Sequence, residues 1–183
     1  SALEFPALGS AEFNGTSDYI QVLSDGKGST FETQEFTIGA WVYVDSTASD
    51  NPIWSFDFTS HSPLYYAQQL RINPSYQLQL FWNNGSTYRQ LASPTNAVAL
   101  NNWYYVVGTY KSGEQKMYLD GSLLTSSTLS ETITYYNQEV WIGRSNYAYM
   151  DGNLSNVAFW NRTLHPDEIN AIMWKSYEQL DAV

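Results

Sequence analysis

A regular alternation of side chains over residues 103–124, WYYVVGTYKSGEQKMYLDGSLL, is the feature that most constrains how this chain folds. Successive residues of a β-strand point to opposite faces, so Val106 falls on one face and Val107 on the other. Residues 111–114 supply a turn with a glycine for positive φ, and residues 120–121 supply a second turn. The stretch predicts two consecutive hairpins. Apolar residues on both faces predict that they lie inside a two-layer structure.

Strand signals of the same kind recur along most of the chain. Each is a short run rich in β-branched and aromatic residues, and clusters of Gly, Pro, Asn, Asp or Ser separate it from the next. The predicted strands are residues 11–14, 19–23, 36–44, 53–58, 69–73, 77–82, 87–92, 103–110, 115–119, 122–130, 140–143 and 153–160. Around a dozen short strands predict an antiparallel sandwich or barrel.

Residues 164–174 follow a different period. Ile169, Ile172 and Met173 are spaced as on one face of a helix, and Pro166 stands at a suitable first helical position. The sequence therefore predicts one short C-terminal helix packed against the sandwich. A length of 183 residues is typical of one domain with a substantial core.

The amino-acid composition excludes or disfavours several classes of binding partner and site. The chain has 8 Lys and Arg against 18 Asp and Glu, a net charge of −10, which disfavours nucleic acid and anionic membranes. It has no cysteine, which excludes disulfides, thiolate catalysis and cysteine-ligated zinc. No apolar run is long enough to insert across a membrane. The acidity, spread over Asn- and Asp-rich loops, suits hard cations such as Ca²⁺.

Several ordered fragments resemble one family. Together they resemble the laminin-G-like, concanavalin-A-like jelly rolls, also called pentraxin-like, over about residues 11–173. The resemblance implies an all-β, two-sheet antiparallel jelly-roll sandwich with a concave and a convex face, and often a calcium ion. The fragments are AEFNGTSDYI at 11–20, FTIGAWV at 36–42, 103–110, YLDG at 118–121, IG at 142–143 and GNLSNVAFWNRTL at 152–164.

The resemblance also directs attention to a metal site. Relatives often carry an acidic ligand where this chain has Ser155. Asp18, Asn14 and Asp151 still offer oxygen atoms, so the predicted calcium ligands are Asp18, Asn14, Asp151 and Ser155. A second departure is His165, which stands where relatives usually have a serine as the helix cap and which bears on stability.

The resemblance also allows a catalytic function, because the family contains glycanases. Those enzymes place two carboxylates on one strand in a Glu-x-Asp-x-x-Glu pattern, which this chain lacks. Its nearest acids, Glu32 and Glu35, differ by three residues and flank a turn-like run, which favours a solvated loop. His61 and His165 are far apart in sequence and have no second histidine or nucleophile motif nearby. The chain is therefore predicted to be noncatalytic.

Sugars are bound by aromatic faces together with planar polar side chains. The family positions assign six rings to packing: Trp41, Trp103, Trp141, Phe13, Phe36 and Phe159. Three turn-rich segments remain, and each mixes aromatic with polar residues, as loop tips that contact ligands do. The candidate ligand-binding residues are Trp82, Tyr88, Arg89, Asp57, His61, Tyr65, Tyr66, Asn146, Tyr147 and Tyr149.

Within this set, Trp82 is the leading candidate. A hairpin through Asn84-Gly85 brings Trp82 close to Tyr88 and Arg89 on the returning arm. On this interpretation, Trp82→Ala abolishes glycan binding and leaves the fold intact. The alternative for each aromatic residue is a structural role, in which it covers an edge of the sandwich and does not bind ligand.

These inferences combine into one hypothesis. The chain is a single domain over residues 1–183, with residues 1–10 a linker remnant, excised from a larger secreted or cell-surface protein. Its predicted function is noncatalytic, lectin-like glycan or polysaccharide binding in an extracellular setting, with calcium as a cofactor. An adhesion domain that binds a protein or peptide is the first alternative, and a structural spacer domain is the second.

Overall fold

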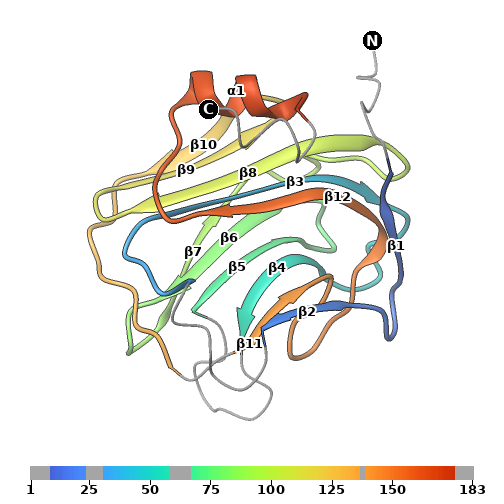
Figure 1. The fold of residues 1–183 in the computed structure, drawn as a ribbon, viewed down its shortest axis with the longest axis horizontal. Coiled ribbons are helices and arrows are strands. Elements are labelled where there is room, and N and C mark those ends of the chain that lie inside the picture. Colours follow the sequence, from blue (N-terminus) through green and yellow to red (C-terminus); the bar gives the residue numbers. More distant parts are fainter. Residues whose placement is uncertain (1–8, 24–30, 58–66, 137–138, 176–183) are drawn as a thin grey trace.

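The computed structural model describes residues 9–23, 31–57, 67–136 and 139–175. They form two six-stranded antiparallel sheets and one helix (Figure 1). This arrangement confirms the predicted all-β jelly-roll sandwich with a short C-terminal helix. The first sheet has the order β1-β12-β3-β8-β9-β10. Its strands are β1 (Ala11–Asn14), β12 (Asp151–Trp160), β3 (Phe36–Val44), β8 (Trp103–Lys111), β9 (Glu114–Leu119) and β10 (Ser122–Ser127).

The second sheet has the order β2-β11-β4-β5-β6-β7. All the neighbouring pairs in it are antiparallel, as in the first sheet. The two sheets are stacked, and the chain crosses between them several times, which separates strands that are close in sequence (Figure 1). The strands are β2 (Ile20–Leu23), β11 (Glu139–Ile142), β4 (Asn51–Asp57), β5 (Gln68–Ile72), β6 (Leu78–Asn83) and β7 (Tyr88–Ala92).

The two hairpins predicted from residues 103–124 are present. Lys111 pairs with Glu114, and Gly113 between them has φ 86°, the conformation that the turn requires. The second turn uses Asp120 and Gly121, with φ 50° and 77°. Positive φ at both positions is typical of a type I′ hairpin turn, whose twist matches that of the strands.

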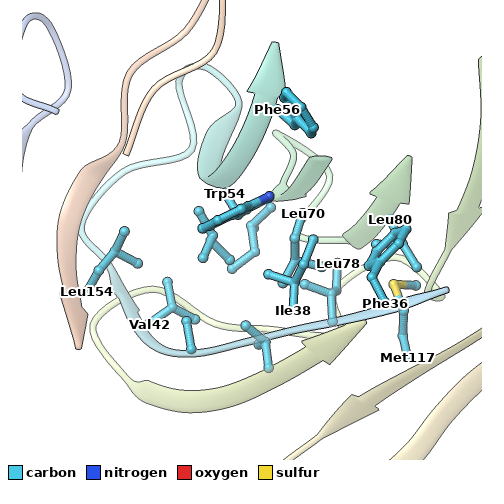
Figure 2. Packing of buried hydrophobic residues seen from close by; sticks show 14 of the residues in the cluster. Phe36, Ile38, Val42, Trp54, Phe56, Leu70, Leu78, Leu80, Met117 and Leu154 are labelled. Carbon is cyan, nitrogen blue, oxygen red and sulfur yellow. The ribbon is translucent and has the colours of Figure 1, made fainter. Parts of the chain in front are cut away.

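The main core lies between the two sheets. Figure 2 shows Ile38 and Val42 of the first sheet facing Trp54 and Leu70 of the second. The Trp54 ring stacks on Phe159 at a centroid distance of 5.3 Å. Because these side chains interdigitate, the separation of the sheets and their relative position are set by core packing.

A second, smaller core lies on the other face of the first sheet, under helix α1 (Pro166–Met173). The predicted helix face is confirmed, because Ile169 and Met173 are buried there beside Trp41. His165 caps the helix as expected, and its side chain accepts a hydrogen bond from the Asp167 N–H. No helix within the described ranges is long and apolar enough to span a membrane.

Trp82 requires a correction, because it belongs to the main core. Its side chain is 1% exposed, and its ring lies 4.7 Å from the Tyr110 ring between the sheets. The predicted hairpin does form, and Trp82 lies opposite Arg89 in it. Strand alternation, however, turns Trp82 inward with Leu78 and Leu80, so the ring is not available to a ligand.

This burial yields a stability prediction. Trp82→Ala leaves a cavity next to Tyr110 and is expected to lower the free energy of unfolding by about 3–5 kcal/mol, as measured by urea denaturation. Leu123→Ala is the control, because Leu123 is 56% exposed and its truncation is expected to change stability by less than about 0.5 kcal/mol. A Trp82→Ala variant as stable as the parent protein would contradict this packing.

Candidate functional site

The face of the second sheet that points away from the main core, here called the outer face, carries polar and aromatic side chains. Trp54 and Phe56 point into the core, so Ser55 and Asp57, which alternate with them along the strand, point outward. Trp141 on β11 lies opposite Ser55 and belongs to neither apolar core. The whole of β4 is nevertheless buried, which means that its outer side is covered as well.

Arg71 organises the middle of the outer face. Its guanidinium forms an ion pair with Asp50 at 3.0 Å, and its Nε donates to Gln79 Oε1 at 2.8 Å. The guanidinium carbon lies 4.2 Å from the centre of the Phe81 ring. Burial raises the pKa of the Asp50 carboxyl, and the charge of Arg71 acts in the opposite direction. The contacts on three sides give Arg71 a fixed orientation.

The hairpin formed by residues 143–150 bends back over this face. Gly143 starts it with φ 78°, where an added Cβ would lie 2.4 Å from a carbon of the Phe13 ring. The Asn146 backbone N–H donates to Asp57 Oδ2 at 2.9 Å and ties the tip of the hairpin to β4. This contact brings Tyr147 to 5.8 Å from the Arg71 guanidinium carbon. Tyr147 remains 50% exposed.

A second arginine lies at the base of the hairpin, surrounded by rings. The Arg144 guanidinium carbon is 4.4 Å from the centre of the Trp141 ring and 4.5 Å from that of Tyr19. The Tyr149 ring lies 5.6 Å from the same carbon and 6.4 Å from the Tyr19 ring. Tyr19 is 40% exposed. We call Tyr19, Trp141, Arg144 and Tyr149 the ring cluster.

The structure therefore brings together some of the predicted ligand-binding residues. Asp57, Asn146, Tyr147 and Tyr149 meet at the hairpin on the outer face. Three other candidates, His61, Tyr65 and Tyr66, lie outside the described residues.

The predicted group around Trp82 does not assemble into one surface. Arg89 shares the inner side of the sheet with Trp82 and bonds to Glu131, with its Nε 2.7 Å from Oε2. This contact lowers the pKa of the Glu131 carboxyl. Tyr88 pairs with Asn83 and points to the opposite side, because it is one residue out of register with Arg89.

Sequence reasoning missed Tyr19, Arg71 and Arg144. Each was assigned to a strand or to its flank, where nothing in a single sequence distinguishes an outer-face residue. Trp141 was assigned to packing, and it is indeed fully buried, but under Arg144 rather than between the sheets. The alternation of apolar and polar side chains on β4 and β5 would have located the outer face once the strand order was known.

Among the predicted calcium ligands, Ser155 lies apart from the other three. Asn14 and Asp151 face each other across β1 and β12, but Asn14 Oδ1 already accepts three backbone N–H groups, that of Asp18 included. Ser155 lies four residues further along β12, roughly 13 Å away at the usual strand rise. Its hydroxyl donates to the Gly9 carbonyl. In the described part of the chain, no group of three or more His, Cys, Asp or Glu side chains could hold a metal ion. Calcium binding stays a prediction.

The two stacked antiparallel sheets define a jelly-roll sandwich. Residues 14–170 match the family model Laminin_G_3, described as the concanavalin A-like lectin/glucanases superfamily. The chain therefore belongs to this family, and the family resemblance found in the sequence is confirmed. A comparison with curated proteins gave no match.

Solved structures with the same fold include a carbohydrate-binding module, a pentraxin and the binding domain of a toxin. The CBM40 module of the Ruminococcus gnavus IT-sialidase, bound to alpha2,3 sialyllactose, is 14% identical with a TM-score of 0.70, covering 90% of this chain and 97% of that chain. A heptameric SAP-like pentraxin from Limulus polyphemus is 15% identical with a TM-score of 0.61, covering 88% and 80%. The binding domain of botulinum neurotoxin DC, in complex with rat synaptotagmin II, is 15% identical with a TM-score of 0.64, covering 88% and 41%. At these identities, the likeness establishes the fold alone.

The glycine that starts the hairpin can be tested. Gly143→Ala is expected to lower the free energy of unfolding by more than Gly113→Ala, because both glycines have positive φ but only the Cβ at residue 143 meets a ring. Backbone strain costs about 1 kcal/mol at either site, and the overlap with Phe13 adds about 1–3 kcal/mol at Gly143. Thermal and urea unfolding of both variants measure the difference. Equal losses would contradict the described contact.

Proposed function

We propose that this domain is a noncatalytic, lectin-like module that binds glycan on the outer face of the second sheet. The observation that carries the proposal is the exposure of Tyr19 and Tyr147 next to two arginines on one face of a lectin-type jelly roll. Exposed rings are the groups that stack on the CH faces of a sugar. The glycan-bound state of the R. gnavus CBM40 module supports the same class of ligand.

The arrangement suits reversible binding of a sugar. The Asp57 contact and the arginine–ring contacts hold the hairpin and its tyrosines in place, so that little ordering is required when a ligand binds. Polar side chains on the same face, Gln90 of β7 among them, offer hydrogen bonds to hydroxyl groups. Rings supply contact area, and the polar groups supply orientation.

The acids on this face support a noncatalytic role. Asp57 and Glu139 are direct partners across β4 and β11, the type of spacing that a glycosidase pair requires. Asp57 Oδ2, however, accepts the Asn146 N–H, and Glu139 Oε2 accepts both the Trp141 indole N–H and the Gln21 side-chain amide, each at 3.0 Å. These bonds tie β2 to β11 and the hairpin to β4, which is a structural task.

The cellular setting is part of the proposal. Glycan-binding modules of this family act where polysaccharides and cell-surface glycans are found, so we propose an extracellular location within a larger protein. Calcium is proposed as an accessory ion only. Binding measurements made with added Ca²⁺ and with a chelator separate a calcium-dependent site from a calcium-independent one.

A glycan array followed by calorimetry tests the proposal. The parent protein is expected to bind a defined glycan, and Tyr147→Ala is expected to weaken that binding about ten-fold, because a ring that contacts the ligand is lost. The thermal midpoint is expected to stay close to that of the parent protein, since Tyr147 is half exposed.

Leu123→Ala is the matched control, because Leu123 is an exposed residue on β10, the edge strand of the other sheet. It is expected to leave glycan affinity unchanged. An array without any bound glycan, or a Tyr147→Ala variant that binds as tightly as the parent protein, would reject the outer face as the binding site.

A protein ligand is the second candidate function, and one feature favours it. A groove of about 520 Å³ lies between the outer strands of the two sheets, lined mainly by apolar side chains. Ile20 at its rim is 46% exposed, and Val22 on the same strand is 36% exposed. Both β1 and β2 are edge strands, so an extended peptide could pair with a free strand edge there.

This candidate has its own test. If an extended peptide is the physiological ligand, a blank glycan array will be accompanied by saturable binding of a purified peptide partner. Ile20→Asp is expected to abolish that binding, because it places a charge on the apolar rim. Peptide affinity unaffected by Ile20→Asp would exclude the groove.

A further inference from the structure

Arg144 differs from the other arginines of this chain in its lack of an acidic partner. Within the described residues, its side chain has neither an ion pair nor a hydrogen bond, and its Nε is buried without an acceptor. In a chain with 18 acidic and 8 basic residues, an acidic neighbour is easily supplied. The other three arginines have one: the pairs are Arg71–Asp50, Arg89–Glu131 and Arg162–Glu168.

The rings around Arg144 hold its guanidinium in place but do not accept hydrogen bonds from its N–H donors. Trp141 and Tyr19 contact the group through their π faces, at 4.4 and 4.5 Å from its central carbon. Such contacts favour the cation and fix its plane, but the N–H donors lie in that plane and bond to acceptors there. A guanidinium held by rings, with its donors unpaired, is preorganised for an oxyanion that accepts two parallel hydrogen bonds.

A purely structural role accounts for only part of this arrangement. Ring contacts alone explain why Arg144 holds Tyr19 and the hairpin against β11. They do not account for the lack of an acceptor, within the described residues, at both the buried Nε and the terminal nitrogens, because native proteins seldom leave a buried donor unpaired. The partly exposed position of the side chain leaves room for a ligand to approach the terminal nitrogens.

We infer that the glycan bound at the outer face carries an acidic group, carboxylate or sulfate, which pairs with the Arg144 guanidinium between Tyr19 and Tyr149. This inference rests on the proposed glycan-binding function and specifies its ligand class. The rings beside Arg144 contact the body of the same sugar, so the charge and the stacking surface act on one residue of the glycan.

The charge of the whole domain limits the kind of acidic glycan. With a net charge of −10, the domain repels a polyanion over most of its surface. Glu139, which accepts the Trp141 indole N–H, adds a negative charge next to the ring cluster. A glycan with one acidic residue is therefore favoured over a highly sulfated or polyuronic chain.

The test compares acidic glycans with their neutral parents. An array carries oligosaccharides that end in a sialic acid, a uronic acid or a sulfated sugar, each beside its desialylated, carboxyl-reduced or unsulfated parent. The parent protein is expected to bind at least one acidic member about ten-fold more tightly than its neutral parent. The three pairs distinguish a carboxylate from a sulfate as the recognised group.

Two substitutions assign the preference to Arg144. Arg144→Gln is expected to bring the acidic glycan and its neutral parent to within about two-fold of each other, since the charge is lost. Arg144→Lys keeps the charge but loses the planar pair of donors, so part of the preference remains. Arg162→Gln is the matched control, because Arg162 pairs with Glu168 next to helix α1, and it is expected to leave the preference unchanged.

The possible outcomes separate the two proposals. Equal binding of acidic and neutral glycans, or an acidic preference that survives both Arg144→Gln and Arg144→Lys, overturns the inference and leaves glycan binding standing. The absence of binding to every glycan overturns the proposed function itself. A variant whose thermal midpoint falls far below that of the parent protein is replaced in the comparison by the other Arg144 variant.

Discussion

The apolar contact between the two sheets is the interaction on which the rest of the structure depends. Trp54 lies at the centre of this contact, with Phe31 at 5.2 Å and Phe159 at 5.3 Å from its ring. With no cysteine in the chain, core packing is the main source of stability. It fixes which face of the second sheet is inside, and through strand alternation it also fixes which side chains reach the outer face.

The outer face is built differently from the core. Its middle is a network of polar side chains around Arg71, in which Ser55, Gln69 and Gln79 are buried and Gln69 Nε2 also donates to Ser55 Oγ at 3.0 Å. A buried polar network of this kind stabilises the structure only when its members are paired, and most of these are. The exposed rings of this face, Tyr19 and Tyr147, lie at its edge, beside or within the 143–150 hairpin. This contrast between a paired middle and an exposed aromatic edge is the reason for proposing the binding site there.

The two ends of the outer face also differ in their charge partners. Arg71 is neutralised by Asp50, whereas Arg144 is held by rings alone in the described part of the chain. The first arginine therefore stabilises the fold and positions Tyr147. The second is the arginine that, in our inference, pairs with an acidic group of the ligand.

The sequence by itself determined the strands, the C-terminal helix and the family. The two hairpins at residues 103–124 follow from alternation and two glycine turns, and these are local signals that do not need the rest of the chain. The sequence also predicts Asn146, Tyr147 and Tyr149 as candidates, because a turn-rich segment with aromatic residues is a local signal too, and the structure places them on one hairpin. The tertiary structure alone decided which side of each strand is inside: Trp82 and Tyr88 lie on one strand pair, yet one is in the core and the other faces outward. It also decided that Tyr19 and Arg144, which are 125 residues apart, meet over Trp141. The face of the sheet that a side chain occupies, and its contacts with residues distant in sequence, depend on strand order. Strand order is in turn set by packing between residues distant in sequence.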